Sequence, residues 1–500
     1  MSLTKTDFIQ FLNCPESIWL KKNIPEKYPE GKFSLFVMKL INEGYEVEEY
    51  AKMLFSNSIN LPENASPEKT LEALKSNHLV FFQPSFKTKK GAFARIDVLE
   101  KLPDGSYHIY EIKSSTKISV SKKHNHVKDA CFQTYVLKEC GYSVSKVSII
   151  YLNKNYVKSG KIEAKKLLKI EDITNKIENI FSTVVNEIND GINFINKETI
   201  NLDQCSCRFK TRTNHCDSFY YFNKDILKYS IYEIGRISEK KINSLINNNC
   251  TKILDINDEI NLNNKQKLQV ESLKKGDAII NNEKVKQNLE GLKFPLHFID
   301  YETYASAVPK IDKLSPHKHL VFQVSIHTLK KNGERSHFEW LGKKMELPHH
   351  MLSEMHEFTG TKGTFISWHS SFEIGRNKDM LNWLPDFDTY LNYMNKHMFD
   401  LEDIFKKDIY IDFKFHGSSS IKKVLPVLCK NFSYSDLEIQ DGTMALDTWG
   451  RMMTDLNFNE SIDKTRKNLL AYCKYDTLAM VEIYSVLRNR IVNNKKIPKF

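Results

Sequence analysis

The stretch that decides the fold is Tyr107-His-Ile-Tyr-Glu-Ile-Lys-Ser-Ser115. Its side chains alternate as in a half-buried strand, so Glu111 and Lys113 leave the same face next to each other. A carboxylate and an ammonium group side by side on a strand are most often a structural ion pair. Taken alone, the stretch favours the structural interpretation.

The segment before this stretch adds a second carboxylate. A predicted strand over residues 92–99 carries Asp97, and Pro103-Asp104-Gly105 after it is a turn signal. A hairpin at this turn brings Asp97 beside Glu111. Two carboxylates and a lysine at one point can hold Mg²⁺ or Mn²⁺ and activate a water molecule for attack on a phosphate. We therefore expect a metal-dependent centre in this hairpin.

The composition indicates a large folded protein with more than one domain. Of the 500 residues, 41% are hydrophobic and 11% aromatic, which is enough for sizeable cores. Lys and Arg number 73 against 62 Asp and Glu, and the net charge of +11 suits an anionic partner, although a lysine-rich composition gives the same excess. Neither a secretory leader nor an apolar run of about eighteen residues is present, so we expect a cytoplasmic protein without a membrane span.

Strand and helix signals divide the chain into three predicted parts. Residues 1–225 alternate helix and strand signals, residues 226–290 are polar and helical, and residues 291–500 return to alternating strands and helices. The expected fold class is α/β, with a helical linker between two domains. Within the first domain, the pattern predicts one long amphipathic helix over residues 162–190 that stops at Gly191.

The first domain resembles the PD-(D/E)XK nucleases of the RecB and AddB type. Asp97 is followed by Glu111 and Lys113 on the next strand, which is the order of that motif. The resemblance implies that the two acids bind the metal and that Lys113 activates the attacking water. Gln133 lies on the following predicted helix, where these nucleases place a supporting glutamine. Many relatives carry a metal-binding histidine on an earlier helix; Glu48 stands there in this sequence, and either it replaces the histidine as a ligand or the site holds one metal.

Four of the nine cysteines strengthen this resemblance. A disulfide framework is not expected in a reducing compartment. One early and three late cysteines match the layout of the iron–sulfur nucleases of the AddB and CRISPR-adaptation type, which implies a [4Fe–4S] cluster. Zinc is the alternative for four thiolates, and buried core cysteines are a third interpretation. The four residues are Cys14, Cys205, Cys207 and Cys216.

The middle segment contains a weaker pattern. Residues 231–245, followed by residues 253–256, resemble a degenerate helix-hairpin-helix, in which a glycine turn points backbone N–H groups at a phosphate. A helical linker with an exposed lysine face is an equally good interpretation of this composition.

A second acidic centre is predicted in the last part of the chain. Asp300 and Glu302 leave the same face of an apolar strand, and burying two adjacent carboxylates without a cation is unfavourable. Near the C-terminus, Tyr472 and Asp476 lie one helical turn apart on one side of a predicted helix. We therefore expect a cation among the carboxylates of this strand and this helix.

These residues resemble the DEDD exonucleases of ribonuclease H-like fold. The resemblance implies that Asp300, Glu302 and Asp476 hold two metal ions and that Tyr472 positions the attacking water. The remaining acid of the family is an aspartate, and the matching position here is Glu373, whose side chain is longer. Asp400 is an additional candidate that could instead cap a helix.

The loop between these acids extends the resemblance to nearly the whole chain. Residues 416–426 combine small residues with two lysines, which suits either a nucleic-acid backbone or an exposed helix start. With residues 300–303 and 434–442, this segment resembles a bacterial family known only as a domain of unknown function. That family joins a RecB-like, cysteine-bearing nuclease half to an exonuclease-like half.

The sequence therefore predicts a metal-dependent nuclease that hydrolyses phosphodiester bonds, acting on DNA rather than RNA and from a chain end, in repair, processing or defence. One alternative is a nucleic-acid-binding scaffold that keeps both folds without turnover. Another is an RNA exonuclease that acts through the C-terminal domain, because the ribonuclease H-like site does not select the sugar by itself.

Overall fold

The computed structural model describes residues 1–29, 31, 34–62, 64–121, 124–257, 260–430, 432–455 and 457–494. The chain divides into two compact units, and each is described by itself. The first unit contains residues 1–226 and 306–317, and the second contains residues 227–305 and 318–500. Both are mixed α/β structures, as the sequence predicts for the fold class. Residues 227–290, for which the sequence predicts a separate linker, belong to the second unit.

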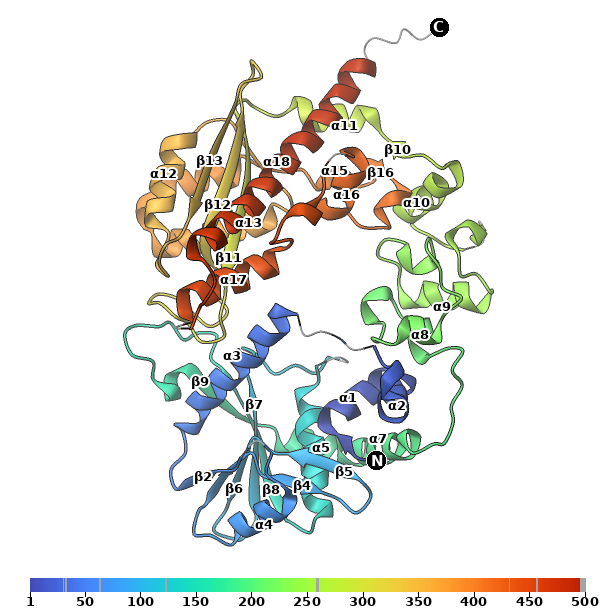
Figure 1. Ribbon diagram of the computed structural model, residues 1–500, viewed down its shortest axis with the longest axis vertical. Coiled ribbons are helices and arrows are strands. Elements are labelled where there is room, and N and C mark those ends of the chain that lie inside the picture. Colours follow the sequence, from blue (N-terminus) through green and yellow to red (C-terminus); the bar gives the residue numbers. More distant parts are fainter. Residues whose placement is uncertain are drawn as a thin grey trace. The chain divides into compact units, whose positions relative to one another are not determined.

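The first unit begins with helices and continues as a sheet with helices on it (Figure 1). Its helices are α1 (Lys5–Asn13), α2 (Pro15–Asn23), α3 (Leu35–Lys52), α4 (Pro67–Leu74), α5 (His126–Glu139), α6 (Ala164–Leu167), α7 (Thr174–Ile195) and α8 (Phe219–Phe222). Its strands are β1 (Leu3–Thr4), β2 (Ser58–Asn60), β3 (Val80–Phe82), β4 (Ser85–Lys87), β5 (Ala92–Arg95), β6 (Val98–Lys101), β7 (Tyr107–Lys113), β8 (Val144–Leu152) and β9 (Leu168–Asp172).

The main sheet of the first unit has the strand order β2-β3-β6-β7-β8-β9. The predicted hairpin is confirmed: β6 and β7 are antiparallel with Val98 opposite Tyr110, so Asp97 comes just before the strand that faces Glu111. The predicted single strand over residues 92–99 is wrong. It consists of β5, which belongs to a second sheet of order β1-β5-β4, and β6, because the chain changes sheets between them.

The long helix predicted over residues 162–190 is also wrong. Its first part forms α6 and β9, and β9 pairs antiparallel with β8 at the sheet edge. Helix α7 then continues through Gly191 to Ile195. Gly191 is a packing position instead of a stop, because a Cβ there would lie 3.1 Å from the Leu3 side chain and 3.3 Å from that of Phe11.

The second unit begins with short helical segments and continues as a second sheet. Its helices are α9 (Glu239–Asn247), α10 (Asn264–Lys275), α11 (Asn282–Glu290), α12 (His349–Thr359), α13 (Ser371–Trp383), α14 (Asp388–Lys396), α15 (Asp403–Lys406), α16 (Ile421–Leu428), α17 (Gly442–Thr454) and α18 (Ile462–Asn494). Its strands are β10 (Ile279–Ile280), β11 (Leu296–Tyr304), β12 (Leu320–Leu329), β13 (Arg335–Leu341), β14 (Thr364–Ser367), β15 (Met398–Asp400) and β16 (Tyr410–Ile411).

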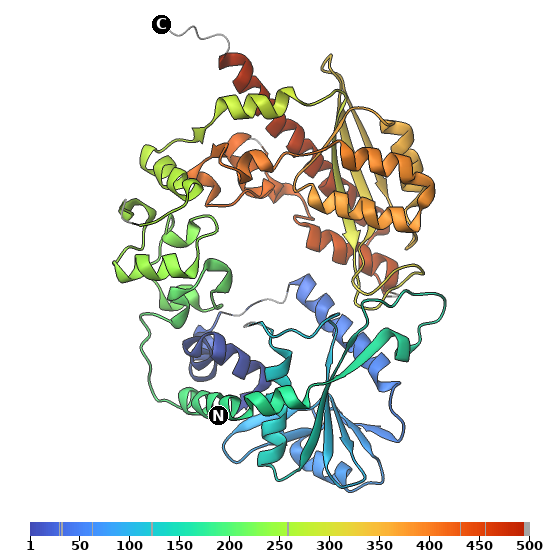
Figure 2. The same cartoon turned by 180° about the vertical axis from the view of Figure 1, so that it is seen from behind.

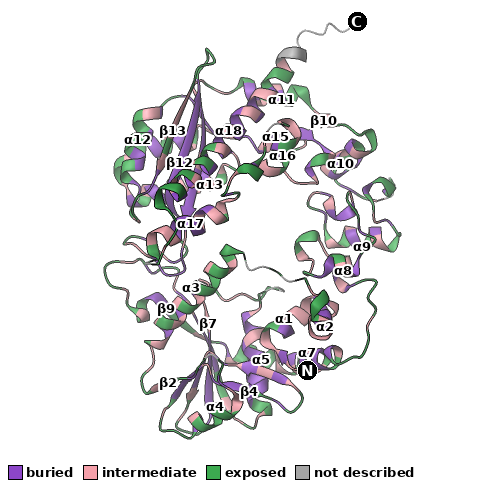
Figure 3. Cartoon of the chain, viewed as in Figure 1, coloured by how far each residue is buried: buried purple, intermediate pink, exposed green. Residues whose placement is uncertain are grey.

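The main sheet of the second unit has the strand order β13-β12-β11-β14-β15. Strand β12 is antiparallel to both of its neighbours, β13 and β11, whereas β11, β14 and β15 run parallel to one another. Helices α17 and α18 cover one face of this sheet, and helices α12 to α14 lie on the opposite face (Figures 1 and 2). The strands β11 and β12 between these layers are almost entirely buried (Figure 3).

Helix α18 is the longest helix of the second unit and packs along β11 and β12. Its buried positions include Leu469, Cys473 and Met480, which recur at helical spacing, while charged residues occupy its other faces. This mixture is typical of an amphipathic helix on a sheet. Within the described part of the chain, no helix combines the length and the apolar character that a membrane crossing needs.

In the segment with the helix-hairpin-helix pattern, residues 239–247 form α9, and Ile231–Glu233 and Ile253–Asp255 form single 3-10 turns; α10 follows the pattern, and β10 pairs with β16. The Gly235 backbone N–H donates to the Gln269 side chain at 2.9 Å, and the Gln266 amide donates to the Gly235 carbonyl at 3.1 Å. The glycine turn is therefore hydrogen-bonded to α10, and its amide is already satisfied within the unit.

We expect Gly450→Ala to lower the free energy of unfolding of the second unit by about 1–3 kcal/mol. A Cβ at Gly450 in α17 would overlap the buried ring of Tyr304 in β11. Gly375→Ala in α13 is the control, because a Cβ there meets nothing within 4 Å, and it should raise stability by up to about 1 kcal/mol. Urea unfolding followed by tryptophan fluorescence measures both, since Trp449 adjoins Gly450. Equal effects of the two variants would contradict this packing.

Candidate active site and metal centres

A carboxylate cluster lies in the second unit, on strand β11 and helix α18; Glu302 and Asp476 are buried and Asp300 is half-buried. Oxygens of Asp300, Glu302 and Asp476 all lie within 4.8 Å of one another. The first two carboxylates share a face of β11, where a β-bulge follows Glu302, and Asp476 comes from α18 packed against that strand. The structure thus brings together the three acids that the sequence placed 176 residues apart at most.

The electrostatics of this cluster favour a bound cation. Burial raises the pKa of Asp300 and of Glu302 well above the usual range, and neighbouring carboxylates raise both further. Burial also raises the pKa of Asp476 to about 6. Like charges this close in a low-dielectric interior stay ionised only if a cation lies among them. Carboxylate oxygens are the donors that Mg²⁺ and Mn²⁺ prefer, so these residues fit such ions.

Two tyrosines hold Asp476. The Tyr434 hydroxyl donates to Asp476 Oδ1 at 2.5 Å, and hydrogen bonds from Tyr434 and Tyr472 act to lower the pKa of Asp476 against the effect of burial. Burial and the adjacent Asp476 carboxylate raise the pKa of Tyr472, so its phenol stays protonated. Tyr434 was not predicted as a site residue, although the sequence pattern included its segment.

Lys422 brings positive charge to the same cluster. Its ammonium group lowers the pKa of Glu302 and of Asp476, and it lies 5.6 Å from the ring centre of Tyr434. Its Nζ donates to the Gln440 carbonyl at 2.7 Å. The residue sits near the start of α16, in the lysine-bearing segment that the sequence singled out.

Glu373, the fourth predicted acid, lies on α13 and is 2% exposed. It is outside the close set of three, but its charge contributes to the raised pKa of Asp300 and of Glu302. Burial raises its own pKa to about 8. Its Oε2 has no hydrogen-bond partner among the described residues. Glu373 therefore lies next to the cluster, and its Oε2 is available to bind a ligand.

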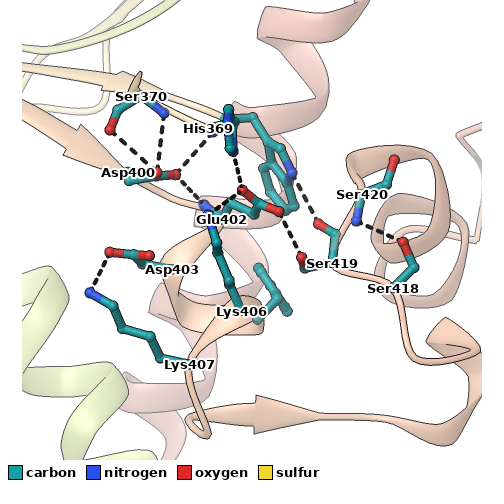
Figure 4. Close-up of polar contacts among 12 residues, drawn as sticks. His369, Ser370, Asp400, Glu402, Asp403, Lys406, Lys407, Ser418, Ser419 and Ser420 are labelled. Atoms are coloured by element: carbon teal, nitrogen blue, oxygen red, sulfur yellow. Dashed lines mark hydrogen bonds and ion pairs between the residues drawn. The ribbon is translucent and has the colours of Figure 1, made fainter. Parts of the chain in front are cut away.

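The turn before α13 is built by two further acids (Figure 4). His369 has a φ of +73°, a left-handed conformation that is unfavourable for a side chain with a Cβ. Asp400 accepts hydrogen bonds from the backbone N–H groups of His369 at 3.0 Å and Ser370 at 3.1 Å. Asp400 thus fixes the turn that leads to Glu373; the N-cap residues of α13 and α15 are Ser370 and Glu402.

Glu402 joins this turn to the loop before α16. It accepts a hydrogen bond from Ser419 Oγ at 2.6 Å and pairs with His369 Nδ1 at 2.9 Å, and Lys406 lies 3.5 Å away (Figure 4). The Trp368 indole donates to the Ser419 carbonyl at 3.1 Å. These contacts attach the ends of β14 and β15 to the segment that carries Lys422, so Glu402 positions two sides of the carboxylate cluster together.

The first predicted centre lies in the first unit around Glu111, whose side chain is 1% exposed. Its Oε1 is 2.7 Å from Lys113 Nζ and 2.6 Å from Lys5 Nζ, and its Oε2 accepts a hydrogen bond from the Gln133 amide. Burial acts to raise the pKa of Glu111, but the two ammonium groups outweigh it and hold the pKa low. Lys113 also pairs with Asp129 at 2.7 Å. Lys5 was not predicted, because nothing in the sequence links α1 with β7.

Asp97 adjoins this ion-pair network. Its Oδ2 accepts a hydrogen bond from the Ile112 backbone N–H at 2.8 Å, and burial together with Glu111 raises its pKa to about 7. Glu48 lies on α3, where Gln83 donates to it at 3.0 Å and Lys52 lies 3.6 Å away. Among the described residues, Glu48, Asp97 and Glu111 do not form a close set of three ligand atoms. With both Glu111 oxygens engaged, this centre fits a metal ion less well than the second.

The predicted cysteine set is a cluster in the first unit. The sulfur atoms of Cys14, Cys205, Cys207 and Cys216 all lie within 4.8 Å of one another. Cys14 stands between α1 and α2, and the other three come from the turns after α7, so the cluster joins the two ends of the unit. Four thiolates at this separation can hold zinc or an iron–sulfur cluster.

Polar groups surround these sulfurs. The Asn223 amide donates to Cys205 Sγ at 3.4 Å, and Cys14 Sγ lies 3.4 Å from a Glu16 carboxylate oxygen. Glu16 also accepts from the Ser206 backbone N–H at 3.1 Å and from its hydroxyl at 2.8 Å. Such groups orient metal ligands and fix their charge, so the cysteine cluster has the surroundings of a ligand set.

A family match to known proteins lies mostly in the second unit. Residues 297–420 match a family model described as a domain of unknown function (DUF2779). The matched segment extends from β11 to the loop before α16, so it includes Asp300, Glu302 and Glu373, and α18 with Asp476 follows it. The predicted relation to a family of unknown function is confirmed for this segment.

Two relatives extend the similarity. The uncharacterized protein MG366 homolog of Mycoplasma pneumoniae is 29% identical over 241 residues, which are 44% of this chain and 36% of the relative. The uncharacterized protein MG366 of Mycoplasma genitalium is 26% identical over 281 residues, which are 52% of this chain and 40% of the relative. The matched part of this chain thus spans less than half the length of either relative.

We expect Cys207→Ser to remove the metal held by the cysteine cluster and to lower the unfolding temperature of the first unit, because three thiolates bind more weakly than four. Cys140→Ser, at a half-buried cysteine outside the cluster, is the control and should keep the full metal content. Elemental analysis of protein purified without oxygen measures zinc and iron. Absorbance near roughly 400 nm identifies an iron–sulfur cluster. Equal metal content in both variants would contradict this assignment.

We expect the affinity of the second centre for Mn²⁺ to rise with pH between about 6 and 8. Protons on carboxyl groups with raised pKa values must leave before a cation binds, so affinity gains up to about tenfold per pH unit for each proton displaced. Calorimetric titration at three pH values measures this, and Asp300→Asn, which removes one ligand, should bind Mn²⁺ more weakly at each pH. A flat profile would show that the carboxylates bind no cation.

Proposed function

We propose that this protein is a metal-dependent nuclease that hydrolyses phosphodiester bonds at the carboxylate cluster of the second unit, with DNA as the preferred substrate. The observation that carries the proposal is the close set of Asp300, Glu302 and Asp476, of which the last two are buried and the first half-buried, all with raised pKa values. A divalent cation satisfies this arrangement, and two such cations would stabilise the attacking and leaving oxygens of a phosphodiester.

The surrounding fold supports this assignment. Three antiparallel strands followed by two parallel ones, with the acids on the central strand, are the arrangement expected for a ribonuclease H-like exonuclease. The Tyr472 and Asp476 pair on α18 agrees with the same resemblance. The net charge of +11 suits a nucleic acid, and the exonuclease resemblance favours cleavage from a strand end.

The side chains of the cluster take distinct roles in this proposal. The acids bind the cations, and the protonated Tyr472 phenol orients the attacking water by donating a hydrogen bond. Glu373 contributes its unpaired oxygen from the other side of the site. Lys422 lies next to the acids, so its ammonium group neutralises a phosphate that approaches them.

The cysteine cluster has a structural role in the proposal. A [4Fe–4S] cluster, or zinc in its place, would link Cys14 to the three cysteines that follow α7 and so stabilise the first unit. The PD-(D/E)XK resemblance of the first unit extends the proposal to a second site for nucleic acid, at Asp97, Glu111 and Lys113.

We expect Asp300→Asn to reduce Mg²⁺- or Mn²⁺-dependent cleavage of a labelled single-stranded DNA by about 100-fold or more, equal to about 2.7 kcal/mol of transition-state stabilisation. Loss of one carboxylate removes a ligand and a charge from the cation site. Tyr472→Phe should lower the rate less, because the cations remain bound. Gel analysis of product lengths over time measures the rates and the direction of cleavage.

Asp97→Asn and a matched RNA strand complete this experiment. If Asp97→Asn abolished cleavage while Asp300→Asn did not, hydrolysis would belong to the first unit. Faster cleavage of the RNA would reverse the preference for DNA. Salt-sensitive binding without any cleavage would indicate a scaffold.

A further inference from the structure

Lys5 occupies an unusual position in the first unit. It is the first residue of α1, where the positive end of the helix dipole disfavours an ammonium group. Its side chain is only 27% exposed, and its Nζ lies 2.6 Å from Glu111 Oε1. A lysine placed against both the dipole and burial requires compensation, and the buried Glu111 carboxylate supplies it.

A cavity of about 620 Å³ opens above this pair. Lys5, Lys113 and Asp129 line it, whereas Asp97 and Glu111 are not among its lining residues. The side chain of Lys113 is 19% exposed. Asp129 and Asp217 also line the cavity, but Asp129 is paired with Lys113 and Asp217 accepts a hydrogen bond from the Tyr28 hydroxyl. An entering group therefore meets two ammonium groups whose neighbouring carboxylates already have partners. Histidines and amides make up much of the remaining wall: His124, Asn125, His126, Gln10, Asn13 and His215.

The two lysines at the cavity floor have N–H donors left for an anion. Lys5 and Lys113 already neutralise Glu111, and the Gln133 amide engages its other oxygen. A divalent ion would have to displace these donors before it reached that carboxylate. A phosphate, in contrast, accepts hydrogen bonds from the exposed side of both ammonium groups without breaking either ion pair, since each ammonium group has three donors.

We propose that this cavity binds a phosphate of a nucleic-acid strand, and that Lys5 and Lys113 form its floor. The inference rests on the proposed function for the choice of a nucleic acid as the ligand. It assigns to Lys5 a substrate-binding role that the nuclease motif does not contain. In this site Lys5 supplies positive charge where the motif's metal ions otherwise supply it.

The test measures binding without hydrolysis. A labelled single-stranded DNA is titrated with the full-length Asp300→Asn/Asp476→Asn protein in EDTA, by fluorescence anisotropy at several salt concentrations. Lys5→Met should weaken binding and make the slope of log K against log salt less steep by about 0.7, the value for one phosphate contact on a single strand. Lys113→Met should give a similar change in slope. The Lys5→Met/Lys113→Met variant should change the slope about twice as much.

Two further variants control for charge and folding. Lys176→Met removes another ion-paired lysine of the first unit, at 2.8 Å from Glu171 and outside the cavity, and should leave the slope unchanged. Lys5→Arg keeps the charge and should retain the slope. If Lys5→Met fails to fold because Glu111 loses its partner, Lys5→Met/Glu111→Gln removes both charges and gives the same test.

The outcomes separate this inference from the proposed function. An unchanged slope in Lys5→Met and in the double variant with Glu111→Gln would overturn the phosphate site, whatever the nuclease assay gives. A reduced slope supports it even if the carboxylate cluster of the second unit proves inactive, because this assay requires no cleavage.

Discussion

In both units, carboxylates lie largely away from water, and their negative charge must be balanced by nearby groups or ions. In the second unit, β11 and α18 hold Asp300, Glu302 and Asp476 within 4.8 Å of one another. Their mutual repulsion raises the cost of ionisation, and hydrogen bonds from Tyr434 and Tyr472 compensate only at Asp476. The network of Asp400 and Glu402 keeps the surrounding turns in place although His369 is strained. This unit is therefore arranged to attract a cation.

The first unit meets the same constraint with its own side chains. Glu111 is more deeply buried than those acids, but Lys5 and Lys113 contact one of its oxygens and Gln133 contacts the other. The result is a centre whose buried carboxylate is neutralised by lysines. Although the sequence shows an acidic motif in each half, the two centres thus differ in electrostatic character: the carboxylates of one lie close to each other, whereas the carboxylate of the other is paired with two ammonium groups.

Local spacing made part of this site predictable. Asp300 and Glu302 are two residues apart on a strand, and Tyr472 and Asp476 are four apart on a helix, so periodicity alone aligns each pair. The hairpin that joins Asp97 to Glu111 follows from its turn residues. Lys5 contacts Glu111 across 106 residues of sequence, and Tyr434 reaches Asp476 across 42; no local pattern encodes either contact. The error at residues 162–190 arose because the edge strand β9 carries the same mixture of lysine and apolar residues as a helix face.

Residues 306–317 belong to the first unit although they lie between β11 and β12 in the chain. Ala307 and Val308 are buried in a core cluster of that unit, and Lys310 and Asp312 form ion pairs with Glu46 and Lys158. A fragment that ended at residue 226 would expose the apolar surface that Ala307 and Val308 cover. The two units therefore cannot be separated by cutting the chain at a single point. A protein designed to contain the first unit alone would have to include residues 306–317 as an added segment.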